Sequence, residues 1–204
     1  MSKDSYVFKE KPGASAEAPV LFLFHGTGGD ENQFLALAGQ LLPEARLVAP
    51  RGDVSEHGAN RFFKRTGEGV YDMDDLALRT RKMADFVTDQ IGDSRPSQVI
   101  GLGYSNGANI LASVLFAAPE LFTGAVLMHP LIPFAPPPAP ALARAGVLIT
   151  AGRRDPICPA PQSQALADYF AGQGARTELV WHEGGHEVRN EELAAVQRFL
   201  ATAR

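Results

Sequence analysis

The chain has 204 residues, 45% of them hydrophobic and 21% charged, and a formal net charge of −4 at pH 7. This length and composition are typical of a folded chain rather than a disordered one, and we expect residues 1–204 to form a single domain. The mildly acidic balance, without a basic stripe, argues against nucleic acid or an anionic membrane surface as the main partner.

Short apolar runs alternate along the chain with segments of helical periodicity. In chain order, we predict strands at residues 6–8 and 20–24, a helix at 30–42, a strand at 46–49, a helix at 72–91, a strand at 99–103, a helix at 106–117, strands at 124–128 and 146–151, a helix at 158–173, a strand at 177–182 and a helix at 190–202. The runs VLFLF and VLIT are apolar on consecutive positions, which favours strands buried on both faces of a parallel sheet. The pattern therefore predicts an α/β fold with a mostly parallel sheet of about seven strands between helices.

Residues 130–140, PLIPFAPPPAP, interrupt this alternation. Proline lacks a donor N–H and restrains its neighbours to extended shapes, so a stiff irregular loop is expected here. It is either a connector between strands or a short wall of the site's mouth, and it is too short for a helical lid.

The sequence was also searched for a membrane span, a secretory signal and pairs of cysteines. No stretch approaches the roughly 18 apolar residues of a membrane span, and the start, MSKDSYVFKEKPG, lacks the apolar centre of a secretory signal. The single cysteine, Cys158, excludes an internal disulfide and a cysteine-only metal cage. We expect a cytoplasmic protein with no integral membrane segment.

Residues 103–107, GYSNG, match the G-x-S-x-G pattern of a nucleophile elbow. The pattern follows the apolar run VIGLG and precedes the helical pattern ANILASVLFAA, so Ser105 falls on a strand-to-helix turn. Glycines on either side allow the close packing that such a turn requires. We interpret Ser105 as a nucleophile rather than as a helix cap.

A second glycine-rich turn, residues 25–29 (HGTGG), directly follows the strand VLFLF. Such a turn aims backbone N–H groups at a developing negative charge, and a phosphate loop is disfavoured because its lysine is missing. We predict an oxyanion hole made by the amides of Thr27 and of Asn106, the residue after the nucleophile.

An acid and a base follow in the chain order Ser, Asp, His of α/β-hydrolases. Asp155 comes after the strand GVLITAG, at the edge where parallel sheets bind ligands, whereas its competitor Asp168 falls within a helical pattern. His186 lies on a glycine turn after the last strand. Of the five histidines, the other four are expected to be structural, rim or solvated residues: His25, His57, His129 and His182.

Residues 182–186, HEGGH, also satisfy the H-E-x-x-H string of zinc proteases. That chemistry needs both histidines on one face of a helix. Two consecutive glycines would cost such a helix about 2 kcal/mol, and the preceding TELVW is typical of a strand. We therefore expect neither a metal nor an organic cofactor.

With these motifs assembled, the chain resembles the bacterial carboxylesterase/phospholipase-like branch of the α/β-hydrolases, which is related to acyl-protein thioesterases and quinone-resistance hydrolases. The resemblance rests on FLFHGTGGDE, VAPRGDV, GLGYSNGANI, GRRDPICP and EGGHEV, spread over nearly the whole chain. It implies an α/β-hydrolase fold without a cap domain, a triad of Ser105, Asp155 and His186, and the same two oxyanion amides. Acyl-protein thioesterases usually have glutamine at the position of Asn106, which weakens the case for protein deacylation.

Candidate substrate-pocket residues are Tyr104, Arg51, Phe62, Phe63 and His129. Arg51 either contacts a polar or anionic substrate group or forms a structural ion pair, which we expect; Phe62 and Phe63 either wall an apolar pocket or pack in the core. For His129, a core or rim position is the expectation.

These residues predict a serine carboxylesterase that cleaves a small-molecule ester of small or medium acyl size. Thioesters, lysophospholipids and quinone-derived adducts stay open as substrates, as does a non-enzymatic binding role. A homodimer formed through an edge strand or the proline loop also stays open.

Overall fold

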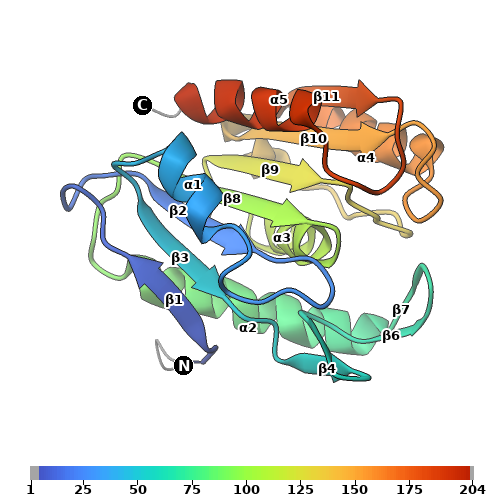
Figure 1. Ribbon diagram of the computed structural model, residues 1–204, viewed down its shortest axis with the longest axis horizontal. Helices are drawn as coiled ribbons and strands as arrows, with labels where there is room; N and C mark the ends of the chain where they lie inside the picture. The colour runs from blue at the N-terminus through green and yellow to red at the C-terminus, as the bar shows by residue number, and fades with distance from the viewer. Residues whose placement is uncertain (1–4, 203–204) are drawn as a thin grey trace.

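The computed structural model describes residues 5–202, so the ends of the predicted domain, 1–4 and 203–204, lie outside the described residues. A seven-stranded sheet with the order β1-β3-β2-β8-β9-β10-β11 forms its centre (Figure 1). Its strands are β1 (Phe8–Lys11), β2 (Val20–Phe24), β3 (Arg46–Pro50), β8 (Val99–Tyr104), β9 (Gly124–Met128), β10 (Gly146–Gly152) and β11 (Arg176–His182). All neighbouring strands are parallel except β1, which pairs with β3 in the antiparallel sense. The predicted α/β class is confirmed.

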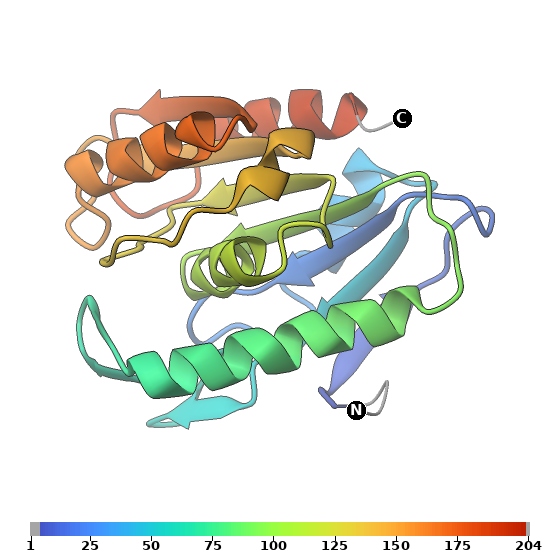
Figure 2. The same cartoon turned by 180° about the vertical axis from the view of Figure 1, so that it is seen from behind.

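Helices cover both faces of the sheet. One face carries α1 (Leu35–Leu41) and α5 (Asn190–Ala201), and Figure 2 shows the opposite face under α2 (Met73–Ile91), α3 (Asn106–Ala117) and α4 (Ala160–Gly172). A short 3₁₀ helix, η1 (Pro140–Arg144), follows the proline-rich segment, which is otherwise irregular as expected.

Strand β2 shows why consecutive apolar residues are needed in such a sheet. Phe22 and Phe24 pack into the core beneath α2, α3 and α4, whereas Leu21 and Leu23 pack into the core beneath α1 and α5. Successive side chains of a strand point to opposite faces, so a strand covered on both sides must be apolar throughout.

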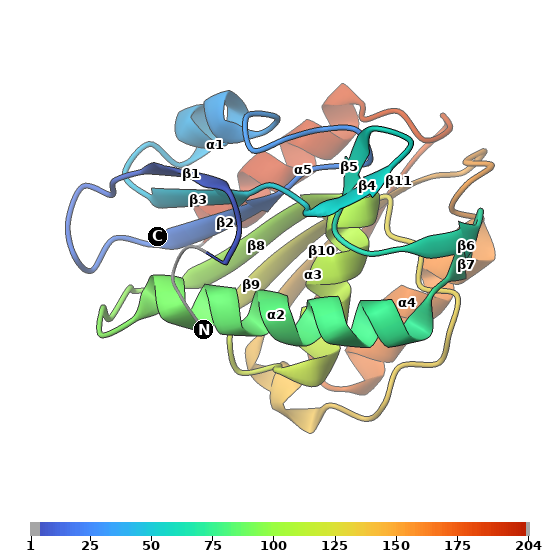
Figure 3. The same cartoon turned by 90° about the horizontal axis from the view of Figure 1, so that it is seen from below.

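Two hairpins between β3 and α2 were not predicted. They consist of β4 (Val54–Glu56) with β5 (Ala59–Arg61) and β6 (Arg65–Gly67) with β7 (Val70–Tyr71). Both lie beyond the C-terminal ends of the parallel strands (Figures 1 and 3). Strands of two or three mostly polar residues show no apolar run, so periodicity could not reveal them.

Three predicted elements begin two or more residues away from their observed starts, for local reasons. The first strand is Phe8–Lys11, not 6–8, because this charged edge strand gives little apolar signal. The helix expected from residue 30 begins at Leu35, since Asp30 Oδ1 accepts the Asn32 amide at 2.8 Å in a turn that competes with helix. The helix expected from residue 158 begins at Ala160, after a turn organised by Asp155.

Within residues 5–202, no helix has the length and hydropathy to cross a membrane.

Candidate active site

Ser105 lies on the predicted strand-to-helix turn, between β8 and α3. Its φ of 51° is in the left-handed region, which is strained for a residue with a Cβ and recurs at functional sites. A Cβ on Gly103 would lie 2.6 Å from the carbonyl carbon of Gly107, and one on Gly107 would overlap the carbonyl oxygen of Phe24. Glycine is therefore required at position 103 for β8 to approach the first turn of α3, and at position 107 for that turn to pack against β2.

His186 lies between Ser105 and Asp155. Its Nε2 is 2.9 Å from Ser105 Oγ, and its Nδ1 is 2.7 Å from Asp155 Oδ2. Since the carboxylate accepts a hydrogen bond, it favours the tautomer with the proton on Nδ1 and leaves Nε2 to accept the serine hydroxyl. The Asp155 side chain is fully buried, whereas that of His186 is 18% exposed and reaches the surface.

The turn after β10 holds Asp155 in place. Its Oδ1 accepts the amides of Ile157 and Cys158 at 2.8 and 2.9 Å. Burial acts to raise the pKa of Asp155, but the Cys158 amide and the rings of His129 and His186 outweigh it and hold the pKa below its ordinary value. The carboxylate is thus ionised across the neutral range.

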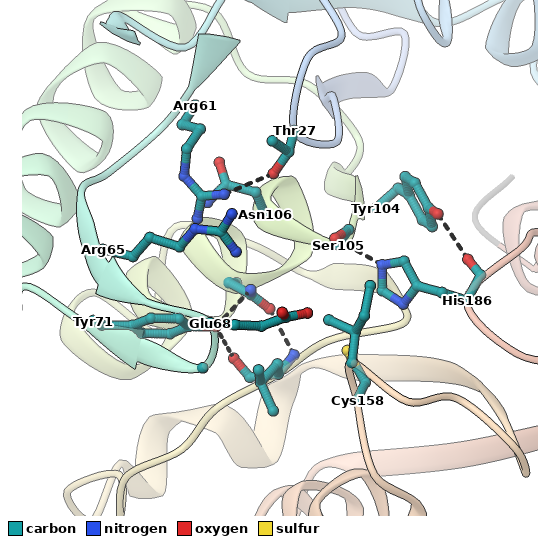
Figure 4. A pocket seen from close by; sticks show the side chains of 14 residues that line it. Thr27, Arg61, Arg65, Glu68, Tyr71, Tyr104, Ser105, Asn106, Cys158 and His186 are labelled. Atoms are coloured by element: carbon teal, nitrogen blue, oxygen red, sulfur yellow. Dashed lines mark hydrogen bonds between the residues drawn. The ribbon is translucent and has the colours of Figure 1, made fainter. Parts of the chain in front are cut away.

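Ser105 and His186 open into a cavity of about 280 Å³ (Figure 4). One side is formed by residues next to the turn, including Thr27, Tyr104 and Asn106. Asn109 of α3, Leu131 after β9, and Ile157 and Cys158 after β10 also line the cavity. The opposite side comes from the unpredicted hairpins, through Arg61, Arg65, Glu68, Gly69 and Tyr71. The sequence analysis did not predict that these hairpins line the site. The one local indication was the charged segment 61–68, which lies between glycine-containing turns.

The two predicted oxyanion residues face the cavity together. Asn106 begins α3, so its amide is among the first N–H groups of the helix, which have no carbonyl partner within it. Its side-chain Oδ1 accepts a 2.7 Å hydrogen bond from the Phe62 amide, and this bond holds the Asn106 side chain in place. Thr27 Oγ1 accepts a 2.8 Å hydrogen bond from Arg61 Nη1, so the first hairpin steadies the glycine turn.

Of the five candidate pocket residues, only Tyr104 lines this cavity. Phe62 and Phe63 are fully buried in the core, where they stack edge-on against Phe24 and Tyr71. His129 is fully buried behind Asp155 and does not reach the cavity.

Arg51 is also away from the cavity and forms the expected ion pair. Its Nε and Nη2 donate to the two oxygens of Glu31 at 2.6 and 2.7 Å. A bidentate pair leaves this guanidinium committed to a neighbouring loop. This is the structural ion pair that was expected for Arg51.

The other histidines and the competing aspartate have structural surroundings. His25 is buried and its Nε2 accepts the Gly52 amide at 2.9 Å, whereas His57 is exposed in the β4–β5 turn. Asp168 is exposed on α4 and accepts a hydrogen bond from Gln164. His182 ends β11 and His186 follows in a loop, so the H-E-x-x-H string is not on one helix.

Among residues 5–202, two sets of side chains bring possible metal-ligand atoms within 4.8 Å of one another: His129, Asp155 and His186, and His129, His182 and Glu192. In both sets, these atoms lie at hydrogen-bonding distance from partners in the same set, such as His129 Nε2 and Glu192 Oε1 at 2.9 Å. The arrangement is complete as a hydrogen-bonded network without an ion.

The chain is similar to known proteins over nearly its whole length. The pattern of the dienelactone hydrolase family matches residues 55–196. A protein of Bacillus subtilis (strain 168) described as the hydrolase MhqD is 43% identical over 187 residues, 90% of this chain and 93% of that protein. The crystal structure of Atu2452 from Agrobacterium tumefaciens str. C58, a protein of unknown function, is 57% identical, covers 100% of both chains and has a TM-score of 0.96.

A Bacillus cereus carboxylesterase is 34% identical, with a TM-score of 0.92 over 98% of this chain and 96% of its own. These similarities confirm the predicted α/β-hydrolase fold and the resemblance to bacterial carboxylesterases.

Proposed function

The chain belongs to the dienelactone hydrolase family, and from this premise we propose that it is a serine carboxylesterase working through an acyl-enzyme. The observation that carries the proposal is the continuous hydrogen-bonded line from Ser105 Oγ through His186 to the buried carboxylate of Asp155, with distances of 2.9 and 2.7 Å. Such a line activates a hydroxyl that is a weak nucleophile on its own.

In the first half-reaction, His186 Nε2 takes the Ser105 proton as Oγ attacks the ester carbonyl carbon. The oxygen of the tetrahedral intermediate accepts hydrogen bonds from the amides of Thr27 and Asn106. The C–O bond to the alcohol then breaks, and the alcohol leaves with the proton from His186. Asp155 keeps the ring in its working tautomer and stabilises its protonated form.

In the second half-reaction, water gives a proton to His186 and attacks the acyl-enzyme. The acid is released when the bond to Ser105 breaks and the proton returns to Oγ. Apart from the ester and water, every group in this cycle belongs to the chain, so the proposed activity needs no cofactor.

The cavity supports a small ester as substrate. A volume of about 280 Å³ is at the lower end of the roughly 300–1,000 Å³ typical of ligand sites. Turnover of p-nitrophenyl esters is expected to fall as the acyl chain lengthens from acetate and butyrate to laurate. Thioesters of the same acyl groups are the alternative donors, since they form the same acyl-enzyme, and direct comparison of ester with thioester turnover distinguishes them.

The decisive experiment is labelling with a fluorophosphonate probe. The wild type, Ser105→Ala and the matched control Ser163→Ala are incubated with the probe, and any adduct is located by peptide mass. Ser163 is buried in α4, and its hydroxyl has no hydrogen-bond partner there, so its removal should be harmless. We expect an adduct on Ser105 in the wild type and control, and loss of p-nitrophenyl acetate turnover in Ser105→Ala alone. Absence of adduct with equal, negligible turnover in all three proteins would contradict the proposal.

A further inference from the structure

A second imidazole lies directly behind Asp155. His129 directly follows β9 with a φ of 50°, and its side chain has no exposed surface. Its Nδ1 is 2.9 Å from Asp155 Oδ2, the same oxygen that meets His186 Nδ1 at 2.7 Å. One carboxylate oxygen therefore holds two imidazole rings, one on the solvent side and one on the core side.

The far side of the His129 ring meets a second buried carboxylate. Glu192, on α5, has no exposed side-chain surface, and its Oε1 is 2.9 Å from His129 Nε2. Thr150 Oγ1 donates to the same Oε1 at 2.5 Å, and the Arg189 amide donates to Oε2 at 2.7 Å. Strands β9 and β10 and helix α5 thus converge on one ionised group in the core.

His182 completes the hydrogen bonding of Glu192. Its Nδ1 accepts the Gly184 amide at 3.0 Å, so the ring proton lies on Nε2, which is 3.2 Å from Glu192 Oε2. His182 therefore adds a hydrogen-bond donor to Glu192.

His129, by contrast, has an acceptor at each ring nitrogen. Burial acts to lower the pKa of His129, but Glu192 and Asp155 outweigh it and raise the pKa above its ordinary value. Burial likewise acts to raise the pKa of Glu192, and His129 and Thr150 reverse that effect. Buried charges persist when they are paired and hydrogen-bonded, as a carboxylate–imidazolium–carboxylate chain is here.

We propose that His129 and Glu192 are positioning residues: an imidazolium at His129, held by Glu192, orients Asp155 and weakens its pull on the proton of His186. The inference rests on the proposed function, because it assigns a task to groups that touch only the triad's acid. A positive charge behind Asp155 offsets part of the carboxylate's field, so His186 releases its proton more readily and remains a free base at lower pH.

Other titratable groups also face this cluster. Cys158 Sγ donates to the His129 carbonyl at 3.2 Å, and the Tyr104 ring lies edge-on to His129 at 5.9 Å. Burial raises the pKa of both groups, so both are neutral near pH 7 and leave Asp155, His129 and Glu192 as the ionised members of the cluster.

The test is the pH dependence of kcat/KM in His129→Asn and in the double variant His129→Asn/Glu192→Gln. Asparagine keeps an N–H donor for Asp155 and removes the positive charge. The ring centroids of His129 and His186 are 5.1 Å apart, so the acidic limb should move up by about one pH unit. In the double variant the buried carboxylate of Glu192 is also replaced, so it is not left without its partner. The acidic limb of this variant should also move up, because the lost positive charge of His129 is nearer to His186 than the lost negative charge of Glu192. His57→Asn, an exposed histidine, is the matched control and should leave the limb unmoved.

A ¹⁵N NMR titration of the wild type gives a second reading that needs no turnover: both ring nitrogens of His129 should be protonated at pH 7. The inference would be overturned if the acidic limb of kcat/KM lay at the same pH in both folded variants as in the wild type, or if the His129 ring were neutral at pH 7. Fluorophosphonate labelling of wild-type Ser105 separates the two hypotheses. If Ser105 is labelled but the acidic limb does not move in the variants, only the role of His129 and Glu192 is excluded. If Ser105 is not labelled, the serine mechanism itself is excluded.

Discussion

The hydroxyl of Tyr104 donates a 2.7 Å hydrogen bond to the backbone carbonyl of His186. Burial raises the pKa of Tyr104 to about 12, so this hydroxyl stays protonated, and remains a donor, throughout the working range. The residue before the proposed nucleophile therefore ties the loop of the proposed base to the end of β8 (Figure 4).

Tyr104→Phe should weaken the attachment of that loop while keeping the aromatic ring that lines the cavity. One hydrogen bond contributes about 0.5–1.5 kcal/mol, so kcat should fall about 5-fold while KM changes little. Steady-state kinetics with p-nitrophenyl acetate measure the effect. An unchanged kcat would mean that the loop is held by its other contacts.

Asp155→Asn should remove most of the turnover while the fold persists. An amide at this position disrupts the tautomer and charge of His186, which costs about 10⁴ in kcat for comparable triads. Circular dichroism serves as the folding control. Retention of more than a tenth of the wild-type rate would exclude Asp155 as the acid of the triad.

Gly107→Ala should strongly destabilise the fold, because its Cβ would overlap the backbone oxygen of Phe24 and neither backbone can move without disturbing the sheet. A loss of about 3 kcal/mol or more in the free energy of unfolding is expected, measured by urea denaturation. Gly172→Ala is the matched control: it lies in α4 with open space around it, and should be neutral or stabilising by up to about 1 kcal/mol. Similar stability of Gly107→Ala and the wild type would contradict the tight packing of the turn.

Arg51→Met should alter stability against pH and leave catalysis intact. The hydrogen bonds from Arg51 lower the pKa of Glu31 from 4.5 to about 2. A carboxyl with a depressed folded-state pKa stabilises the protein above its unfolded pKa and loses that contribution as the pH falls toward its folded pKa. The difference in Tm between wild type and variant should therefore be largest above pH 4.5 and narrow as the pH approaches about 2. A large loss of kcat/KM at pH 7 would instead support a role for Arg51 in substrate binding.

Local sequence carried much of this protein's organisation. The apolar runs identified the parallel strands because strands covered on both faces must be apolar throughout, as Leu21 and Phe22 show. Gly103, Ser105 and Gly107 identified the strained turn because only that residue pattern fits a sharp strand-to-helix connection. The position of Asp155 after a strand and of His186 after the next predicted that they meet at one edge of the sheet, and their side chains do meet.

Tertiary structure alone decided what surrounds that edge. Arg61 and Arg65 reach the cavity on hairpins too short and polar to have a periodic signature, and Phe62, between them, turns into the core instead. His129 and Glu192 meet behind Asp155 because a strand end and a distant helix converge there. Such contacts depend on how separate elements pack, and no local pattern of residue types encodes which side chain a remote helix will bring to a given strand end.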